Sequence, residues 1–128
     1  MKGCLTAGLL LGASLIAILY IGDLIETRPT NLFRKLVADP IPQGVTIHQA
    51  ESRLGNAVVF LTFEIGRNDL DAIVERLGLR QAPLKNPIQP PKWFIPSENS
   101  TYWKGRGGTQ ELWYSTESQI AYFKQVNP

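Results

Sequence analysis

The chain has 128 residues and a formal net charge of +2, with 13 lysines and arginines against 11 acids. So small a net charge gives no global field for binding nucleic acid. A single cysteine, Cys4, excludes an internal disulfide and a cysteine-based zinc site, and a single histidine, His48, excludes histidine-rich metal sites. We therefore expect no cofactor, no metal and no nucleic-acid partner.

Residues 4–22 form an uncharged apolar run between Lys2 and Asp23. At about 1.5 Å per residue a helix of this length reaches roughly 28 Å, close to the ~30 Å hydrocarbon core of a bilayer. Residues 1–22 are therefore predicted to be an uncleaved transmembrane signal anchor in a lipid bilayer. The alternative is a cleaved signal peptide and a secreted domain. A lipoprotein signal is disfavoured because only three residues precede Cys4.

The orientation of this anchor follows from the charges on its two sides. Lys2 and the α-amino group favour a cytoplasmic N-terminus, whereas Arg28, Arg34 and Lys35 argue for the reverse. A two-residue tail followed by an apolar run is how export signals begin, so we expect the N-terminus inside. The domain after the anchor is then extracytoplasmic.

Residues 23–43 are predicted to be a juxtamembrane linker. Pro29 ends an upstream helix, because the residue before a proline disfavours the α region. Residues 31–39 then have the apolar spacing of a short amphipathic helix. This helix either lies on the lipid headgroups or packs on its own domain.

Residues 44–128 are predicted to form a small soluble α+β domain. Strand patterns occupy residues 45–50 and 57–65, and the second has apolar residues on both faces, as in a central strand. A helix then begins near Asn68 and is expected to end at Gly78, which suits a left-handed terminator.

The second half of the domain contains a proline-rich segment and a hairpin. Five prolines in residues 81–96 exclude a long helix, leaving room for a short edge strand at 92–95. Residues 110–115 and 119–125 have the pattern of a hairpin. The predicted fold class is α+β: an N-terminal transmembrane helix, then a mainly antiparallel sheet of about four strands in ββαββ order, with one helix packed on it.

Aromatic and basic residues are interleaved in the second half of the chain. Such mixtures bind nucleic acids, sugars or anionic headgroups through stacking and charge. The residues expected to form a binding surface are Trp93, Tyr102, Trp103, Lys104, Arg106 and Trp113. The alternative is that the aromatic rings hold the proline-rich segment on the sheet while the charges are solvated.

His48, with Glu51 and Asp69, is the one set from which an acid–base pair can be drawn. No motif fixes the proximity of these three residues. The glycines of residues 105–108 lack the preceding strand and the GK[ST] ending of a phosphate-binding loop. We therefore predict no catalytic residue, and no reaction is identified.

Four stretches of the chain resemble small bacterial exported or membrane-anchored α+β proteins of unknown function. They are DPIPQGV at residues 39–45, VVFLTFEI, NDLDAIVERLGL and ELWYSTESQIAYFKQ. The resemblance covers residues 39–125 and implies an exported domain, here at the bacterial inner membrane. It carries no catalytic residue, and this chain lacks the usable lipobox cysteine of lipidated examples.

Together these features predict a single-pass membrane-anchored protein whose extracytoplasmic domain binds a protein or an envelope component. One alternative is an accessory subunit of a membrane complex, packed through the small-xxx-small pair Gly8 and Gly12. A second alternative is a minor envelope enzyme that uses His48.

Overall fold

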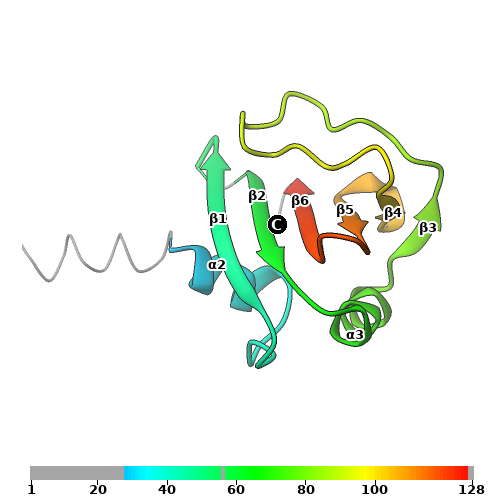
Figure 1. Ribbon diagram of the computed structural model, residues 1–128. Helices are drawn as coiled ribbons and strands as arrows, with labels where there is room; N and C mark the ends of the chain where they lie inside the picture. The colour runs from blue at the N-terminus through cyan, green and yellow to red at the C-terminus, as the bar shows by residue number, and fades with distance from the viewer. Residues whose placement is uncertain (1–27, 56, 127–128) are drawn as a thin grey trace, which may run out of the picture.

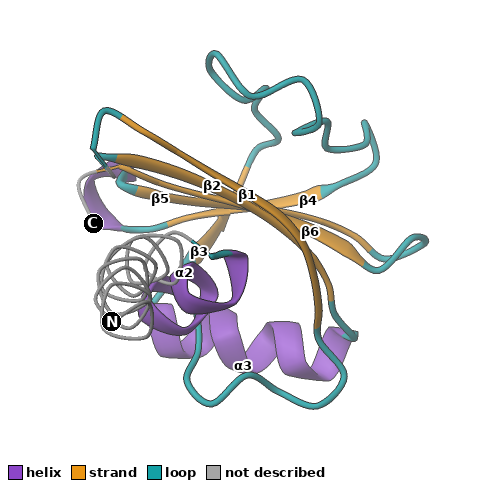
Figure 2. Ribbon diagram, turned by 90° about the vertical axis from the view of Figure 1, so that its left-hand side faces the viewer, coloured by secondary structure: helices purple, strands orange, loops and turns teal. Residues whose placement is uncertain are grey.

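The computed structural model describes residues 28–55 and 57–126. Its elements are α2 (Pro29–Leu36), β1 (Thr46–Arg53), β2 (Val58–Glu64), α3 (Arg67–Leu77), β3 (Arg80–Ala82), β4 (Thr101–Lys104), the 3-10 turn η1 (Arg106–Gly108), β5 (Gln110–Ser115) and β6 (Ile120–Val126). The six strands form one antiparallel sheet in the order β1-β2-β6-β5-β4-β3. Both helices lie on one face of the sheet, and the proline-rich segment lies over the other (Figure 1, Figure 2).

The predicted fold was wrong in its strand number, helix number and element order. The sheet has six strands where about four were expected, and two described helices pack on it where one was expected. The additional strands β3 and β4 have only three and four residues, too few to show an alternating pattern. Residues 92–95, where an edge strand was expected, contain a turn and no strand.

The predicted transmembrane helix is not supported. Residues 1–22, including Gly8 and Gly12, lie outside the described residues. Within residues 28–55 and 57–126, no helix has both the length and the apolar character needed to cross a bilayer.

The main core lies between the helices and the sheet. Leu61, Phe123 and Leu112 are cross-strand neighbours on β2, β6 and β5, and none has any exposed surface. Leu70 and Ile73 of α3 are buried in the same cluster. Burying an aliphatic or aromatic side chain of this kind stabilises a fold by about 1.5–3 kcal/mol, so this layer holds α3 in place.

The short helix α2 packs on the domain itself. Proline is favoured in its first turn, where the missing amide has no intrahelical partner. Phe33 is fully buried and meets Phe63 of β2 edge-on, with ring centroids 4.9 Å apart. Of the two positions expected for this helix, the structure shows the packed one.

A second, smaller core lies on the opposite face of the sheet. Phe60, Tyr102 and Trp113 project from β2, β4 and β5, and Phe94 of the proline-rich segment packs on them. Trp113 also donates its indole N–H to the Lys85 carbonyl at 2.7 Å. The proline-rich segment is thus a packed layer, because aromatic side chains hold it at both ends.

Candidate functional site

A row of mostly charged side chains crosses the sheet on the face that carries the proline-rich segment. Each member is the direct cross-strand partner of the next, so all project from the same face. From one edge to the other, the charged row consists of Glu51, Phe60, Lys124, Glu111, Lys104 and Arg80. Apart from Phe60, the charges alternate in sign until two cations meet at the end.

The centre of the charged row is buried, and its charges are matched. Lys124 Nζ lies 3.9 Å from Glu111 Oε1, with only 10% and 9% of the two side chains exposed. The Tyr102 hydroxyl donates a 2.7 Å hydrogen bond to Glu111 Oε2. Burial, this hydrogen bond and the negative charge of Glu111 raise the pKa of Tyr102 well above its ordinary value. Tyr102 therefore keeps its proton and remains a donor to Glu111.

The end of the charged row, at the edge strand β3, has two cations side by side. Arg80 is the direct cross-strand partner of Lys104. Like charges placed directly opposite each other destabilise a strand pair. Within residues 28–55 and 57–126, neither cation forms an ion pair. Glu111, the other neighbour of Lys104, is already engaged by Lys124 and Tyr102.

A third cation, Arg106, lies in η1 directly after β4. Gly105 allows this turn, because a Cβ atom there would lie 3.1 Å from Gln110 Oε1 and 3.2 Å from Gln110 Cβ. The Gly105 amide donates to the Gln110 carbonyl at 2.8 Å, which holds η1 against β5. Arg106 is exposed and forms no ion pair in the described part of the chain. We call Arg80, Lys104 and Arg106 the cationic edge.

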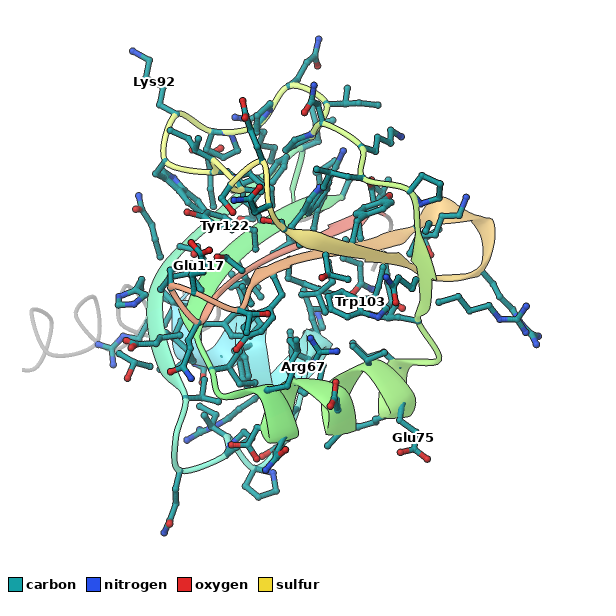
Figure 3. The ribbon with its side chains drawn as sticks, turned by 45° about the vertical axis from the view of Figure 1, so that its right-hand side comes forward. Arg67, Glu75, Lys92, Trp103, Glu117 and Tyr122 are labelled. Carbon is teal, nitrogen blue, oxygen red and sulfur yellow. The ribbon has the colours of Figure 1, made fainter. Side chains whose placement is uncertain are left out.

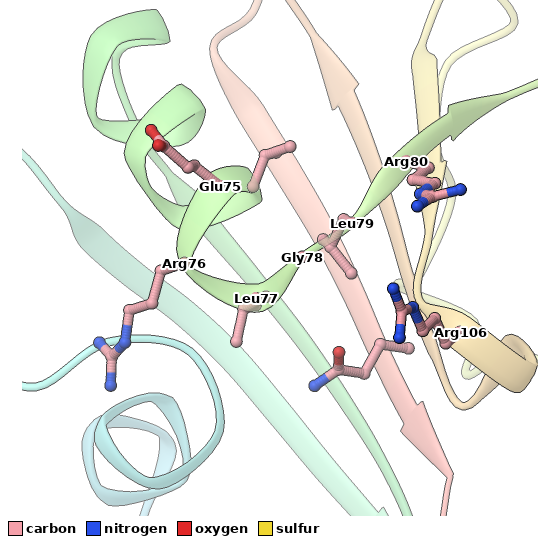
Figure 4. Close-up of a pocket in the computed structure, with 9 residues that line it drawn as sticks. Glu75, Arg76, Leu77, Gly78, Leu79, Arg80 and Arg106 are labelled. Atoms are coloured by element: carbon pink, nitrogen blue, oxygen red, sulfur yellow. The ribbon is translucent and has the colours of Figure 1, made fainter.

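A cleft of about 590 Å³, the α3 cleft, lies between the end of α3 and the cationic edge. Its lining residues are Val74, Glu75, Arg76, Leu77, Gly78, Leu79, Arg80, Arg106 and Gln110. Figure 4 shows Arg80 and Arg106 together on one side, whereas Glu75 and Arg76 extend away from them. The cleft therefore combines an aliphatic wall with two neighbouring guanidinium groups.

The sequence around Gly78 builds this arrangement. Gly78 has a left-handed backbone with φ of 65°, which confirms the predicted helix terminator. The Gly78 and Leu79 amides donate to the carbonyls of Glu75 and Val74, so the last turn of α3 is capped by backbone. The chain then enters β3 at once, which puts Arg80 beside Lys104 and next to the cleft.

The structure separates the aromatic residues that were expected to share a surface. Tyr102 and Trp113 are buried under the proline-rich segment, and Trp93 is half-buried beside them. Trp103 is buried on the opposite face of the sheet, where the Arg67 guanidinium lies 5.7 Å from its ring centroid (Figure 3). Lys104 and Arg106 are exposed and lie close together in the chain, at the cationic edge.

His48 does not meet the two acids with which it was grouped. Its Nε2 lies 3.7 Å from Glu64 Oε2, and about half of each side chain is exposed. Glu51 instead accepts a 2.7 Å hydrogen bond from Arg53. Among the described residues, no ion pair links His48 to Asp69, and no group of three metal-binding side chains is present. Within the described ranges, the ion-pair partner of His48 is thus Glu64 rather than either of the two acids expected.

Sequence reasoning missed the roles of Arg80, Lys124 and Glu111. A local signal existed for the last two, because each charge occupies an alternating position that belongs to a buried face. Lys124 alternates with Tyr122, and Glu111 alternates with Trp113. A signal for Arg80 was its place two residues after the helix terminator Gly78.

No family model, curated protein or solved structure matches this chain.

Proposed function

We propose that the domain is a binding module that holds an acidic, extended segment of another protein at the α3 cleft. The observation that carries the proposal is the pair of neighbouring arginines, Arg80 and Arg106, on one side of that cleft. Guanidinium groups bind carboxylates through paired, charge-assisted hydrogen bonds, so two of them favour an acidic ligand.

The charge pattern of the sheet supports an anionic partner. Arg80 and Lys104 repel each other across the β3–β4 pair, at a cost of the order of 0.2–1 kcal/mol. A carboxylate bound to Arg80 in the cleft would offset that repulsion. The partner would thereby place an acid beside Arg80, at the end of the charged row where two cations are neighbours.

The shape of the site supports a peptide segment. Leu77 and Leu79 give the cleft an aliphatic wall, which a small inorganic anion would leave uncovered. β3 is also the last strand of the sheet, and no other strand of the described residues pairs with its outer edge, where a peptide could add a strand. An extended segment can hydrogen-bond to that edge and place acidic side chains near Arg80 and Arg106.

Binding of a labelled peptide of alternating glutamate and threonine to the 128-residue chain tests this proposal. The test variant combines Arg80→Gln with Arg106→Gln. The matched control combines Lys85→Gln with Lys92→Gln, which removes the same charge from the proline-rich segment. Lys92 extends away from the body of the domain (Figure 3).

Fluorescence anisotropy should show at least about tenfold weaker binding for the arginine variant, because hydrogen bonds to charged groups contribute about 1.5–3 kcal/mol each. The lysine variant should bind like the parent chain. Equal losses in the two variants would mean diffuse charge attraction and would overturn the proposal. So would equally strong binding of a lysine–threonine peptide.

A further inference from the structure

A second cavity, of about 310 Å³, lies at the other end of the charged row, between the β1–β2 turn and the proline-rich segment. We call it the Phe60 cavity. Its lining residues are Arg53, Leu54, Val58, Phe60, Ile88, Gln89, Lys124 and Val126. It shares no lining residue with the α3 cleft, so a ligand bound in one cavity would not occupy the other.

The walls of the Phe60 cavity are mostly apolar and partly exposed. Phe60, Val58 and Val126 are neighbours on the sheet and form its base. Leu54 is 83% exposed and Ile88 is 57% exposed, and these two large apolar side chains belong to the lining. Exposed apolar side chains beside a cavity of this size favour an apolar ligand body.

Both charged residues in the lining are cations. The Arg53 guanidinium lies 5.1 Å from the Phe60 ring centroid, and Lys124 Nζ lies 5.6 Å from it. Their acidic partners, Glu51 and Glu111, are not part of the lining. The charged groups that a ligand over the Phe60 ring would touch are therefore cations, with their acidic partners behind them.

Lys124 retains unused donor capacity. An ammonium group carries three donors, and its side chain here is nine-tenths buried. Its nearest carboxylate oxygen lies 3.9 Å away, too far for a hydrogen bond, so within residues 28–55 and 57–126 the Nζ atom has this ion pair but no close acceptor. Because no buried side-chain nitrogen or oxygen of the described residues lacks a partner, Nζ retains some access to solvent, and a carboxylate entering the cavity could accept a hydrogen bond from it.

Two lining residues of the cavity have an uncommon backbone conformation. Leu54 and Gln89 both have left-handed φ values, 54° and 46°. Residues other than glycine, asparagine and aspartate rarely adopt this backbone conformation. Arg53 Nη1 donates a 2.6 Å hydrogen bond to the Gln89 carbonyl and so joins the two segments. Strained residues that flank a preformed cavity are typical of ligand sites.

We propose that the Phe60 cavity binds a small carboxylate with an unbranched apolar body. The carboxylate accepts hydrogen bonds from Lys124 and faces Arg53. The apolar body lies over Phe60 and between Leu54 and Ile88. This site works independently of the α3 cleft, so either proposal can fail while the other stands.

Titration of the 128-residue chain with octanoate and with octanamide tests the proposal. The two probes have the same apolar body and differ in charge. Octanoate should bind at least about tenfold more tightly, because only it pairs with Lys124. Backbone amide shifts in a heteronuclear NMR spectrum should change at Val58 and Val126. Equal affinities, or shifts elsewhere only, would overturn the proposal.

Two isoleucines of the proline-rich segment provide matched variants. Ile88→Asp places a second carboxylate in the lining and should weaken octanoate binding at least about tenfold by repulsion. Ile95→Asp makes the same change at a residue that is 69% exposed and outside the lining, and it should leave binding unchanged. Both sites are exposed, so folding is not at risk. Equal effects of the two variants would contradict this site.

The double variant Lys124→Met with Glu111→Gln tests the role of the ammonium group. Removing both members of the buried pair together avoids leaving one charge unpaired. The preference for octanoate over octanamide should fall, while octanamide binding is retained. An unchanged preference would show that Lys124 does not hold the carboxylate.

Discussion

The ring of Phe94 meets the indole of Trp113 edge-on, with centroids 5.6 Å apart and ring planes at 89°. Phe94 makes further edge contacts with Phe60 and Tyr122 at 5.1 Å each. One side chain of the proline-rich segment therefore contacts three strands of the sheet. Aromatic pairs of this geometry contribute about 0.5–1.5 kcal/mol beyond the area that they bury.

Phe94→Ala should destabilise the domain by about 3–5 kcal/mol, because it leaves a cavity among aromatic rings. The adjacent change, Ile95→Ala, removes a side chain that is 69% exposed and should cost less than about 0.5 kcal/mol. Urea unfolding followed by tryptophan fluorescence measures both. A loss of similar size for the two variants would contradict the anchoring role of Phe94.

Leu54→Asn should stabilise the domain. Leu54 has a positive φ, and asparagine tolerates the left-handed region better than leucine does. The expected gain is about 1 kcal/mol, since a left-handed backbone costs an ordinary residue that much. The same variant should weaken octanoate binding by removing an apolar wall of the Phe60 cavity. These opposite effects would indicate that Leu54 is retained for binding.

Leu84→Asn is the matched control for this change. Leu84 is also an exposed leucine, 46% accessible, but its backbone is not left-handed. Its replacement should change the stability by less than about 0.5 kcal/mol. A gain equal to that of Leu54→Asn would assign the effect to reduced surface hydrophobicity. Urea unfolding separates the two explanations.

Local sequence patterns predicted those parts of the fold whose stabilising contacts are local. β2, α3 and the hairpin of β5 and β6 each have the alternation or helical spacing of their element. β3 and β4 were missed because their pairing partners decide their structure. Arg80 pairs with Lys104 across a gap of more than twenty residues, which no short window records.

The candidate sites were harder to predict for a related reason. The aromatic residues between Trp93 and Trp113 were expected to share one surface, but strand alternation sends neighbours to opposite faces. Tyr102 and Trp103 therefore belong to different cores. The α3 cleft and the Phe60 cavity each combine residues from at least three segments, so only the sheet order reveals them.

Arg80→Glu should stabilise the strand pair. A carboxylate at this position faces Lys104 directly and replaces a repulsion by an attraction, worth about 0.2–1 kcal/mol. The same variant should abolish binding of the acidic peptide. Arg76→Glu is the matched control, because it makes the same charge change in the last turn of α3. There a negative charge opposes the helix dipole, so a small destabilisation is expected. Equal stability changes would refute the cross-strand explanation.

The described tyrosines predict a loss of stability at alkaline pH. Burial is the main cause that raises the pKa of Tyr102, Tyr114 and Tyr122 above the ordinary value of 10.0. Below pH 10 all three are protonated in both folded and unfolded chains, so their contribution is fully present. Above that pH the unfolded chain releases these protons first, and stability falls until the folded pKa values are passed.

Urea unfolding at about pH 9 and about pH 11 should therefore show a lower free energy of unfolding at the higher pH, with up to about 1.4 kcal/mol per pH unit from each tyrosine. Tyr122→Phe removes one titrating group and keeps the ring that packs against Phe94. Its stability should decline less steeply between the two pH values than that of the parent chain. An identical decline would mean that Tyr122 ionises equally well in the folded domain and that burial does not suppress its titration.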